Sequence, residues 1–288
     1  MVGHQVVREL VLAGHYVVAL MRRADVSLEI RNSFLCDCEL VPGVEVMDID
    51  AVERAIRTAR PDWIVNAAGL IKQRPGSSDQ FRKVNSEFPH QLERLAQKNN
   101  SRIVQISTDC VFSGTRGNYS IADPVDPCDI YGVSKHAGEL CSPNVTFRVS
   151  IVGRELFGAL GLLEWFLAQE GKAYGHQNAF FTGVTTPVLG RAIERAISSD
   201  LEGATYHLPG PKISKASLLR VFREAFKVDT IIEDSLEPCI DRSLVGEWPA
   251  PLGNPLDWPT MVDELVLVNE SYERVRSTQF INVKKDLL

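Results

Sequence analysis

The sequence lacks the cysteine and histidine patterns that mark disulfide frameworks and zinc sites. Its six cysteines are scattered with no Cys-x-x-Cys pair, and no two of its six histidines are three or four residues apart. Both a zinc site and a set of disulfides are therefore poorly supported. Scattered thiols of this kind favour reduced cysteines in a cytoplasmic protein.

Long apolar runs and an excess of positive charge are also missing. No apolar stretch approaches the roughly 20 residues that a membrane-spanning helix needs. Arg8 and Glu9 interrupt the apolar start of the chain, which argues against a signal peptide. With a net charge of −6, the chain is not expected to bind nucleic acid or an anionic membrane. A small anionic substrate stays open, because local basic residues can outweigh the net charge.

Short apolar strands alternate with amphipathic helices over the first half of the sequence. The apolar runs are continuous, which is typical of parallel strands covered on both faces. We therefore expect right-handed β-α-β crossovers and a Rossmann-like, doubly wound parallel sheet of the α/β class. Ligands of such sheets bind beyond the carboxyl ends of the strands. The predicted strands are 16–21, 44–47, 63–65, 103–107 and 145–149, and the predicted helices are 4–13, 51–59, 78–99 and 131–140.

The character of the sequence changes near residue 153. Apolar helices follow at 160–168 and 185–198, then a short strand at 204–208 and a helix at 215–226 that Ser214 would cap. We expect a Rossmann-like dinucleotide-binding domain at 1–153. The remainder, 154–288, is expected to form a smaller substrate-binding or lid region that returns elements to the main sheet.

Three side chains in the middle of the chain suit hydride transfer. Thr108 follows the strand at 103–107, while Tyr131 and Lys135 are four residues apart on the next helix and share one face. We expect the Lys135 ammonium to lower the phenol pKa from its usual value of about 10. Tyr131 would then act as a general acid, and Thr108 would hold a substrate carbonyl. The alternative, a solvated Tyr–Lys pair, is less favoured because the Thr108 strand end precedes it.

Small residues after the strand at 63–65 suit a flat cofactor. Asn66, Ala67, Ala68 and Gly69 would let a nicotinamide dinucleotide approach the backbone, or they form only a tight β–α turn. Tyr131 and Lys135 would contact the same cofactor.

Two further pairs of residues lie where a dinucleotide would bind. Arg22 and Arg23 follow the strand at 16–21, where folds that prefer NAD usually carry an acid. They suit the extra phosphate of NADP(H), although a solvated basic pair explains them equally well. Asp48 and Ile49 would border the adenine, or Asp48 would instead cap the following helix.

The glycine-rich loop of such a fold is incomplete here. Its variant pattern, Gly-x-x-Gly-x-x-Gly, lies between a first strand and a first helix. In this sequence Met1 and Val2 lead through Gly3 directly into the helix. Gly3 fits the third glycine, so we expect the first strand and most of the loop to be missing. Two neighbouring strands would then have unpaired edges, and the phosphate cradle would be lost.

With these motifs the sequence resembles the extended short-chain dehydrogenases/reductases, and within them the dTDP-4-dehydrorhamnose reductase branch. The resemblance covers residue 3 to roughly 242 and implies that NADPH reduces the 4-keto group of a nucleotide-linked deoxysugar for surface polysaccharide. It implies a catalytic triad of Thr108, Tyr131 and Lys135. It also implies that Asp109, Cys110 and Arg148 contact the substrate. The most specific segments are 107–114, 126–132, 131–135 with Gly138-Glu139, and 147–155.

The residue after Thr108-Asp109 bears on the reaction. Related sugar-nucleotide 4,6-dehydratases usually carry glutamate there, so Cys110 argues against dehydration. The rhamnose branch commonly carries tyrosine, so a UDP-linked acetamido sugar is as good a candidate as a dTDP sugar. Two alternatives stay open, namely a non-catalytic regulatory relative and a sugar-nucleotide epimerase. A homodimer and a need for Mg²⁺ are also left open, since the sequence indicates neither.

Overall fold

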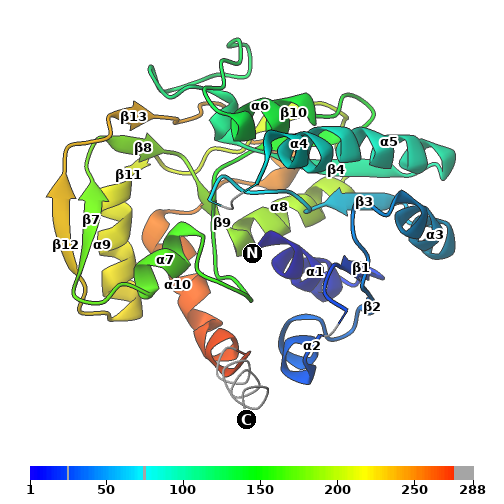
Figure 1. Ribbon diagram of the computed structural model, residues 1–288, viewed down its shortest axis with the longest axis horizontal. Coiled ribbons are helices and arrows are strands. Elements are labelled where there is room, and N and C mark those ends of the chain that lie inside the picture. Colours follow the sequence, from blue (N-terminus) through cyan, green and yellow to red (C-terminus); the bar gives the residue numbers. More distant parts are fainter. Residues whose placement is uncertain (25, 74–75, 276–288) are drawn as a thin grey trace.

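Parallel strands alternate with helices through the first half of the chain, as the sequence predicts (Figure 1). The computed structural model describes all residues except 25, 74, 75 and 276–288. The elements of this half are α1 (Val2–Leu12), β1 (Val18–Met21), α2 (Leu28–Phe34), β2 (Glu39–Pro42), α3 (Ile49–Ala59), β3 (Trp63–Asn66), α4 (Ser78–Phe81), the π-helix η1 (Arg82–Glu87), α5 (Phe88–Lys98), β4 (Arg102–Ser107), the 3-10 helix η2 (Asp109–Val111), α6 (Ile130–Ala137) and β5 (Val145–Arg148).

The second half contains several small sheets between helices. Strands β11, β8 and β13 form one sheet in that order, β12 pairs with β7, and β6 pairs with β9. Its elements are β6 (Ile151–Val152), α7 (Leu162–Leu167), β7 (Lys172–His176), β8 (Ala179–Phe181), β9 (Val184–Thr185), α8 (Thr186–Ser198), β10 (Thr205–His207), β11 (Ile213–Ser214), α9 (Lys215–Phe226), β12 (Ile231–Ser235), β13 (Ile240–Asp241), η3 (Ala250–Leu252) and α10 (Trp258–Leu267).

The central sheet has the strand order β10-β5-β4-β3, with every pair parallel. Strand β10 comes from the second half of the chain and pairs with β5, so the second half contributes to the main sheet. Ile103, Val104 and Phe147 in β4 and β5 are fully buried. The continuous apolar runs are thus explained by helices that cover both faces, and the predicted α/β class is confirmed.

The sheet is divided at the position where a first strand would lie. Strands β1 and β2 form a separate parallel pair, and β3 is the last strand of the four-stranded sheet. In the described part of the chain, no backbone ladder joins β1 to β3, which confirms the expected unpaired edges. Helix α1 packs on α8 instead, where the lack of a side chain at Gly190 lets Glu9 approach.

One predicted strand is wrong. Residues 44–47 form a loop, and the strand lies earlier, at Glu39–Pro42. Gly43 has a φ of 76° and turns the chain after β2. Val44 and Val46 still pack against the apolar cluster of α3, which explains their apolar character. Helix α2 was not expected, although Ser27 accepts a hydrogen bond from the Ile30 backbone as its N-cap.

Candidate active site

Thr108 lies directly after β4 and begins the short helix η2. Its hydroxyl oxygen accepts a hydrogen bond from the Cys110 backbone at 3.2 Å and donates one to Asp109 Oδ1 at 3.1 Å. The Thr108 side chain also acts to lower the pKa of the nearby Tyr131 phenol. Two members of the predicted triad therefore lie near each other at the carboxyl end of β4.

Helix α6 carries Tyr131 and Lys135 and is held close to two neighbouring helices. Asp129 caps it by accepting a hydrogen bond from the Gly132 backbone at 2.8 Å. A Cβ at Gly132 would collide with the backbone carbonyl of Cys110, and one at Gly138 with that of Asn85. These two glycines let α6 lie directly against η2 and η1, which fixes the position of Tyr131.

Lys135 is buried and donates a hydrogen bond to the Ile106 carbonyl in β4 at 2.5 Å. Burial lowers its pKa to about 8, and Glu139 opposes this shift. The expected lowering of the Tyr131 pKa is wrong, because burial and the neighbouring Cys110 raise the pKa of that phenol well above its ordinary value. Tyr131 therefore keeps its proton near neutral pH, as a general acid must.

The loop after β3 lies beside Lys135. Asn66 donates to Gln105 Oε1 at 2.8 Å and accepts from the Ala68 backbone at 3.2 Å, so the turn is fixed at its start. A Cβ built on Gly69 would lie 4.0 Å from Lys135 Nζ and 3.3 Å from Asn85 Oδ1. The structure therefore brings the predicted cofactor loop and the triad together.

Asn85 holds this loop in place, and the sequence analysis missed it. Its side-chain oxygen accepts from the Leu70 backbone at 2.8 Å, while its nitrogen donates to the Leu70 carbonyl at 3.0 Å and to Ser134 Oγ at 3.2 Å. Asn85 lies in the π-helix η1, a rare element that often marks functional positions. No sequence pattern distinguished it from an ordinary helical asparagine.

The other predicted cofactor residues lie around the start of α1 and the end of β1. Gly3 is in the first turn of α1, and a Cβ there would lie 3.7 Å from Ala67 Cβ. Arg22 and Arg23 are exposed after β1. Arg22 lies 4.0 Å from Glu45, and Arg23 lies over the ring of Phe157.

Asp48 and Ile49 begin helix α3. Asp48 accepts a hydrogen bond from the Ala51 backbone at 2.9 Å, so the capping alternative describes it. Ile49 packs against the apolar cluster around Ile56. Neither residue directly follows a strand, because the strand predicted at 44–47 is a loop.

The three residues expected to contact substrate have different surroundings. Asp109 is buried and accepts a hydrogen bond from Ser150 Oγ at 2.5 Å. Burial and Asp109 raise the pKa of the Cys110 thiol to about 12, so it stays protonated. Arg148 is buried in a two-bond ion pair with Glu139, both bonds 2.8 Å long. This geometry gives Arg148 a structural role and does not support the expected substrate contact.

Two basic residues of the second half also face this site. Lys215 is the first residue of α9, and its ammonium interacts electrostatically with Asp109 and Cys110. Arg242 follows β13 and donates hydrogen bonds to the Phe112 carbonyl at 3.0 Å and to Cys128 Sγ at 3.4 Å. The sequence analysis missed both, since nothing in their spacing connects them with residues 108–135.

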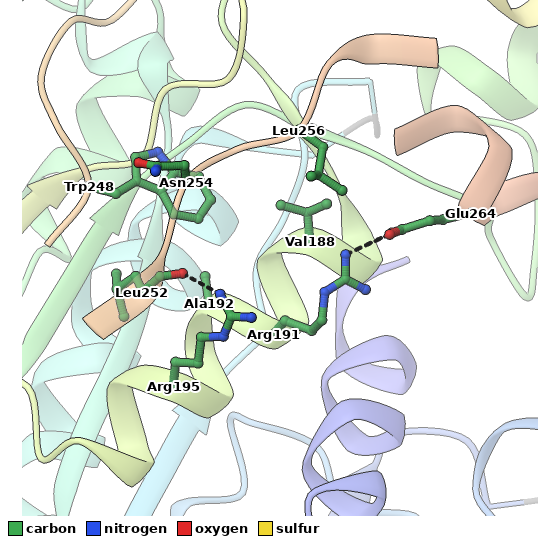
Figure 2. Close-up of a pocket in the computed structure, with 9 residues that line it drawn as sticks. All are labelled: Val188, Arg191, Ala192, Arg195, Trp248, Leu252, Asn254, Leu256 and Glu264. Carbon is green, nitrogen blue, oxygen red and sulfur yellow. Dashed lines mark hydrogen bonds and ion pairs between the residues drawn. The ribbon is translucent and has the colours of Figure 1, made fainter. Parts of the chain in front are cut away.

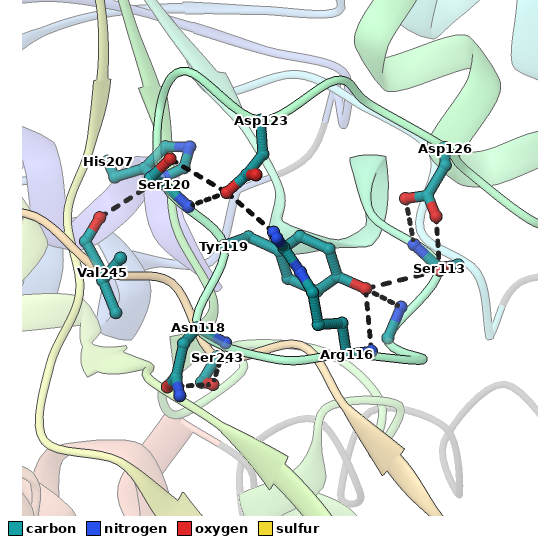
Figure 3. Close-up of polar contacts among 11 residues, drawn as sticks. Ser113, Arg116, Asn118, Tyr119, Ser120, Asp123, Asp126, His207, Ser243 and Val245 are labelled. Atoms are coloured by element: carbon teal, nitrogen blue, oxygen red, sulfur yellow. Dashed lines mark hydrogen bonds and ion pairs between the residues drawn. The ribbon is translucent and has the colours of Figure 1, made fainter.

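The loop between η2 and α6 is tied to the same part of the second half (Figure 3). The Tyr119 hydroxyl accepts from the backbones of Gly114 and Arg116, and Arg116 forms an ion pair with Asp123. The Asn118 backbone donates to Ser243 Oγ at 2.8 Å. These contacts fix the segment after β13, including Arg242, relative to η2.

A separate pocket lies between α8 and α10, and the triad residues are not among those that line it (Figure 2). Its two arginines are engaged, since Arg191 pairs with Glu264 and Arg195 donates to the Leu252 carbonyl at 2.8 Å.

Among the described residues, no cluster of three or more acidic, His or Cys side chains could hold a metal ion. In the described part of the chain, no helix is both long enough and apolar enough to cross a bilayer.

Residues 1–154 match the family described as the RmlD substrate binding domain, and the chain belongs to this family. A similar curated protein is the dTDP-4-dehydrorhamnose reductase of Burkholderia thailandensis, 35% identical over 111 residues, which are 36% of this chain and 37% of that protein. The chain spans about a third of the length of the curated relatives it matches.

Solved structures share the fold over most of the chain. The dTDP-4-dehydrorhamnose reductase of Bacillus anthracis in complex with NADP has a TM-score of 0.71 and 17% identity, covering 88% of this chain and 99% of that one. The UDP-glucose 4-epimerase of Thermotoga maritima with UDP-glucose has a TM-score of 0.74 and 16% identity, covering 94% and 96%. At such low identity these likenesses show the fold alone.

Proposed function

We propose that this protein reduces the 4-keto group of a nucleotide-linked deoxysugar with NADPH, as a dTDP-4-dehydrorhamnose reductase does, for deoxysugar and surface polysaccharide synthesis. The observation that carries the proposal is the meeting of Thr108, Tyr131 and Lys135 at the end of β4, beside the loop 66–69. Membership of the RmlD family and the names of the curated relatives support it.

The residues around Lys135 fit a nicotinamide dinucleotide. Gly3, Ala67 and Gly69 present small surfaces next to one another, and Lys135 lies beside Gly69. Among the residues that the structure describes, Lys135 uses one of its three N–H groups, in the bond with Ile106, which leaves the others to bind a ribose hydroxyl. The guanidinium groups of Arg22 and Arg23 at the end of β1 favour NADP(H) over NAD(H).

The chain's own groups would complete the reduction by handling one proton. When bound, the nicotinamide supplies the hydride for the keto carbon. Thr108 turns its hydroxyl proton from Asp109 Oδ1 to the keto oxygen and so orients that oxygen. Tyr131 then transfers the proton of its Oη to that oxygen as negative charge develops there. The charged ammonium of Lys135 stabilises the phenolate that remains.

The same surroundings disfavour dehydration. An elimination needs a base next to the sugar. Burial raises the pKa of the Cys110 thiol to about 12, so this thiol stays protonated near neutral pH and cannot act as the base. Asp109 keeps the hydrogen bond from the Ser150 hydroxyl. The two alternatives that stay open are an epimerase, whose fold is the same, and a non-catalytic relative.

The test is to incubate the purified chain with NADPH and dTDP-4-dehydrorhamnose, and separately with a UDP-linked 4-keto acetamido sugar. Consumption of one NADPH per sugar reduced would support the proposal. Interconversion of C4 epimers without net NADPH consumption would indicate an epimerase. NADPH binding without turnover of either sugar would indicate a non-catalytic relative.

A further inference from the structure

Glu139 lies where the end of helix α6 meets the ends of strands β4 and β5. It comes four residues after Lys135, and its side chain is only 9% exposed. Its Oε1 accepts hydrogen bonds from Ser107 Oγ at 2.7 Å and from Arg148 Nε at 2.8 Å. Its Oε2 accepts one from Arg148 Nη2 at 2.8 Å. One buried carboxylate therefore joins both strands to the helix that carries Tyr131.

Ser107 connects Glu139 with Thr108. It is the last residue of β4, directly before Thr108, and it lies opposite Arg148 in the parallel pairing of β4 with β5. Its side chain is buried and donates the hydroxyl proton to Glu139. A hydrogen bond to a charged acceptor is stronger than one between neutral groups. Glu139 therefore fixes the end of the strand that leads into Thr108.

The negative charge of Glu139 also acts on Lys135. Burial lowers the pKa of Lys135 to about 8, and the Glu139 carboxylate opposes this shift. In the described part of the chain, no carboxylate lies within ion-pair distance of Lys135, whose hydrogen bond goes to the neutral Ile106 carbonyl. Without the charge of Glu139, the ammonium would therefore lose its proton at a lower pH.

Charged and titratable groups face this carboxylate from α6, β5 and β10. They are Lys135, His136, Arg148 and His207. Burial acts to raise the pKa of Glu139, but its hydrogen bonds, first of all those from Arg148, hold that pKa below its usual value. Burial and the charge of Arg148 lower the pKa of His207, so this imidazole is neutral near pH 7. The carboxylate itself is therefore charged near neutral pH.

We infer that Glu139 is a positioning residue for Thr108 and Lys135. It holds Thr108 in place through Ser107, and its negative charge stabilises the charged ammonium of Lys135. The use of this arrangement in reduction rests on the proposed function, but the action of Glu139 on Lys135 does not. If Glu139 had only a structural role, it would do no more than neutralise Arg148.

The experiment compares the titration of Lys135 in the parent protein, in Glu139→Gln and in Arg148→Met. Both variants break the same buried ion pair, but only Glu139→Gln removes the negative charge. In the full chain labelled with ¹⁵N-lysine, NMR follows the Lys135 ammonium as the pH is changed, and the loss of its signal in Lys135→Met assigns it. Glu139→Gln should lower the pKa of Lys135 by about one pH unit. Arg148→Met should not lower it.

Glu264→Gln is the matched control. Glu264 also accepts two hydrogen bonds from an arginine, Arg191, but it lies on α10, outside the candidate site. Its replacement should leave the pKa of Lys135 unchanged.

The proposed reaction gives a second readout. Because kcat/KM reports the ionisations of the free enzyme, the loss of activity at alkaline pH should follow the deprotonation of Lys135. In Glu139→Gln this loss should occur at lower pH, so that kcat/KM at pH 8 is about 5-fold below that of the parent protein. Glu264→Gln should keep the parental pH profile.

An unchanged Lys135 pKa in a folded Glu139→Gln protein would overturn the inference, and so would an equal lowering in Arg148→Met. Circular dichroism establishes that each variant is folded. If Glu139→Gln does not fold, the double variant Glu139→Gln/Arg148→Met takes its place, because it leaves neither partner charged and unpaired, and the same lowering is expected. If the parent protein reduces no keto-sugar nucleotide, the proposed function fails, while the NMR titration still decides the role of Glu139.

Discussion

The ammonium of Lys135 lies 2.5 Å from the carbonyl oxygen of Ile106, two residues before Thr108. This bond joins the helix that carries Tyr131 to the strand that leads to Thr108. The lysine is buried there without a carboxylate at hydrogen-bond distance among the described residues, and burial lowers its pKa to about 8. The buried position of Lys135 suits the proposed chemistry, but it lowers the free energy of unfolding at neutral pH, because the charged ammonium is removed from water.

Lys135 should make the stability of the protein depend on pH. Its pKa of about 8 in the folded state is below the unfolded value of about 10.4. Between these pH values the unfolded state binds more protons, so the free energy of unfolding should rise with pH by up to about 1.4 kcal/mol per pH unit. Urea unfolding of the parent protein and of Lys135→Met across this range measures the effect. Parallel pH dependence of the two proteins would refute it.

Replacing Tyr131 by phenylalanine removes the proposed proton donor and leaves the packing of the ring. We expect kcat for keto-sugar reduction to fall about 100-fold to 10,000-fold, the usual contribution of a general acid. NADPH affinity should change little. Tyr174→Phe is the control, since Tyr174 is exposed in β7 and distant in sequence from the triad. Equal turnover by Tyr131→Phe and the parent enzyme would rule out the assigned role.

The ion pair of Arg148 and Glu139 should be a large contributor to stability. Both side chains are buried, and Ser107 donates a further hydrogen bond to Glu139 at 2.7 Å. Arg148→Met would remove both guanidinium hydrogen bonds from the buried Glu139 carboxylate and leave it with Ser107 and His136. Breaking a buried ion pair in this way typically costs about 3–5 kcal/mol. The exposed pair of Arg220 and Asp234 offers a control, because Arg220→Met should cost less than about 1 kcal/mol. Chemical unfolding of both variants measures the difference, and similar losses would contradict the structural role of Arg148.

Gly132→Ala should separate helix α6 from η2. The added Cβ would meet the backbone carbonyl of Cys110, which cannot rotate away as a side chain can. We expect both lower stability, by about 1–3 kcal/mol, and lower kcat, because Tyr131 moves away from Thr108. Val133→Ala, on the exposed face of the same helix, is the control. An active enzyme with parental kcat would show that the close approach is not needed.

The pattern of apolar residues predicts most of the first-half sheet because buried parallel strands require continuous apolar runs. It fails at 44–47, where Val44 and Val46 are apolar because they pack against the cluster of α3, and where Gly43 turns the chain after β2. The triad could be predicted because Thr108, Tyr131 and Lys135 lie close in sequence. Lys215 and Arg242 reach η2 only through the pairing of β8 with two other strands, and no spacing encodes that arrangement.

The π-helix η1 has a consequence for which mutations the protein can tolerate. A π turn contains one residue more than an α turn, so the six residues Arg82–Glu87 act as an insertion within the helix that runs from α4 to α5. Deleting the exposed Lys83 would remove this extra residue and close the wide turn into a regular α turn, which displaces Asn85 from its place in the π-helix. Asn85 could then no longer bind Leu70 and Ser134 together. The length of this segment, as much as its composition, is thus under constraint, and substitutions there should be far better tolerated than single-residue deletions.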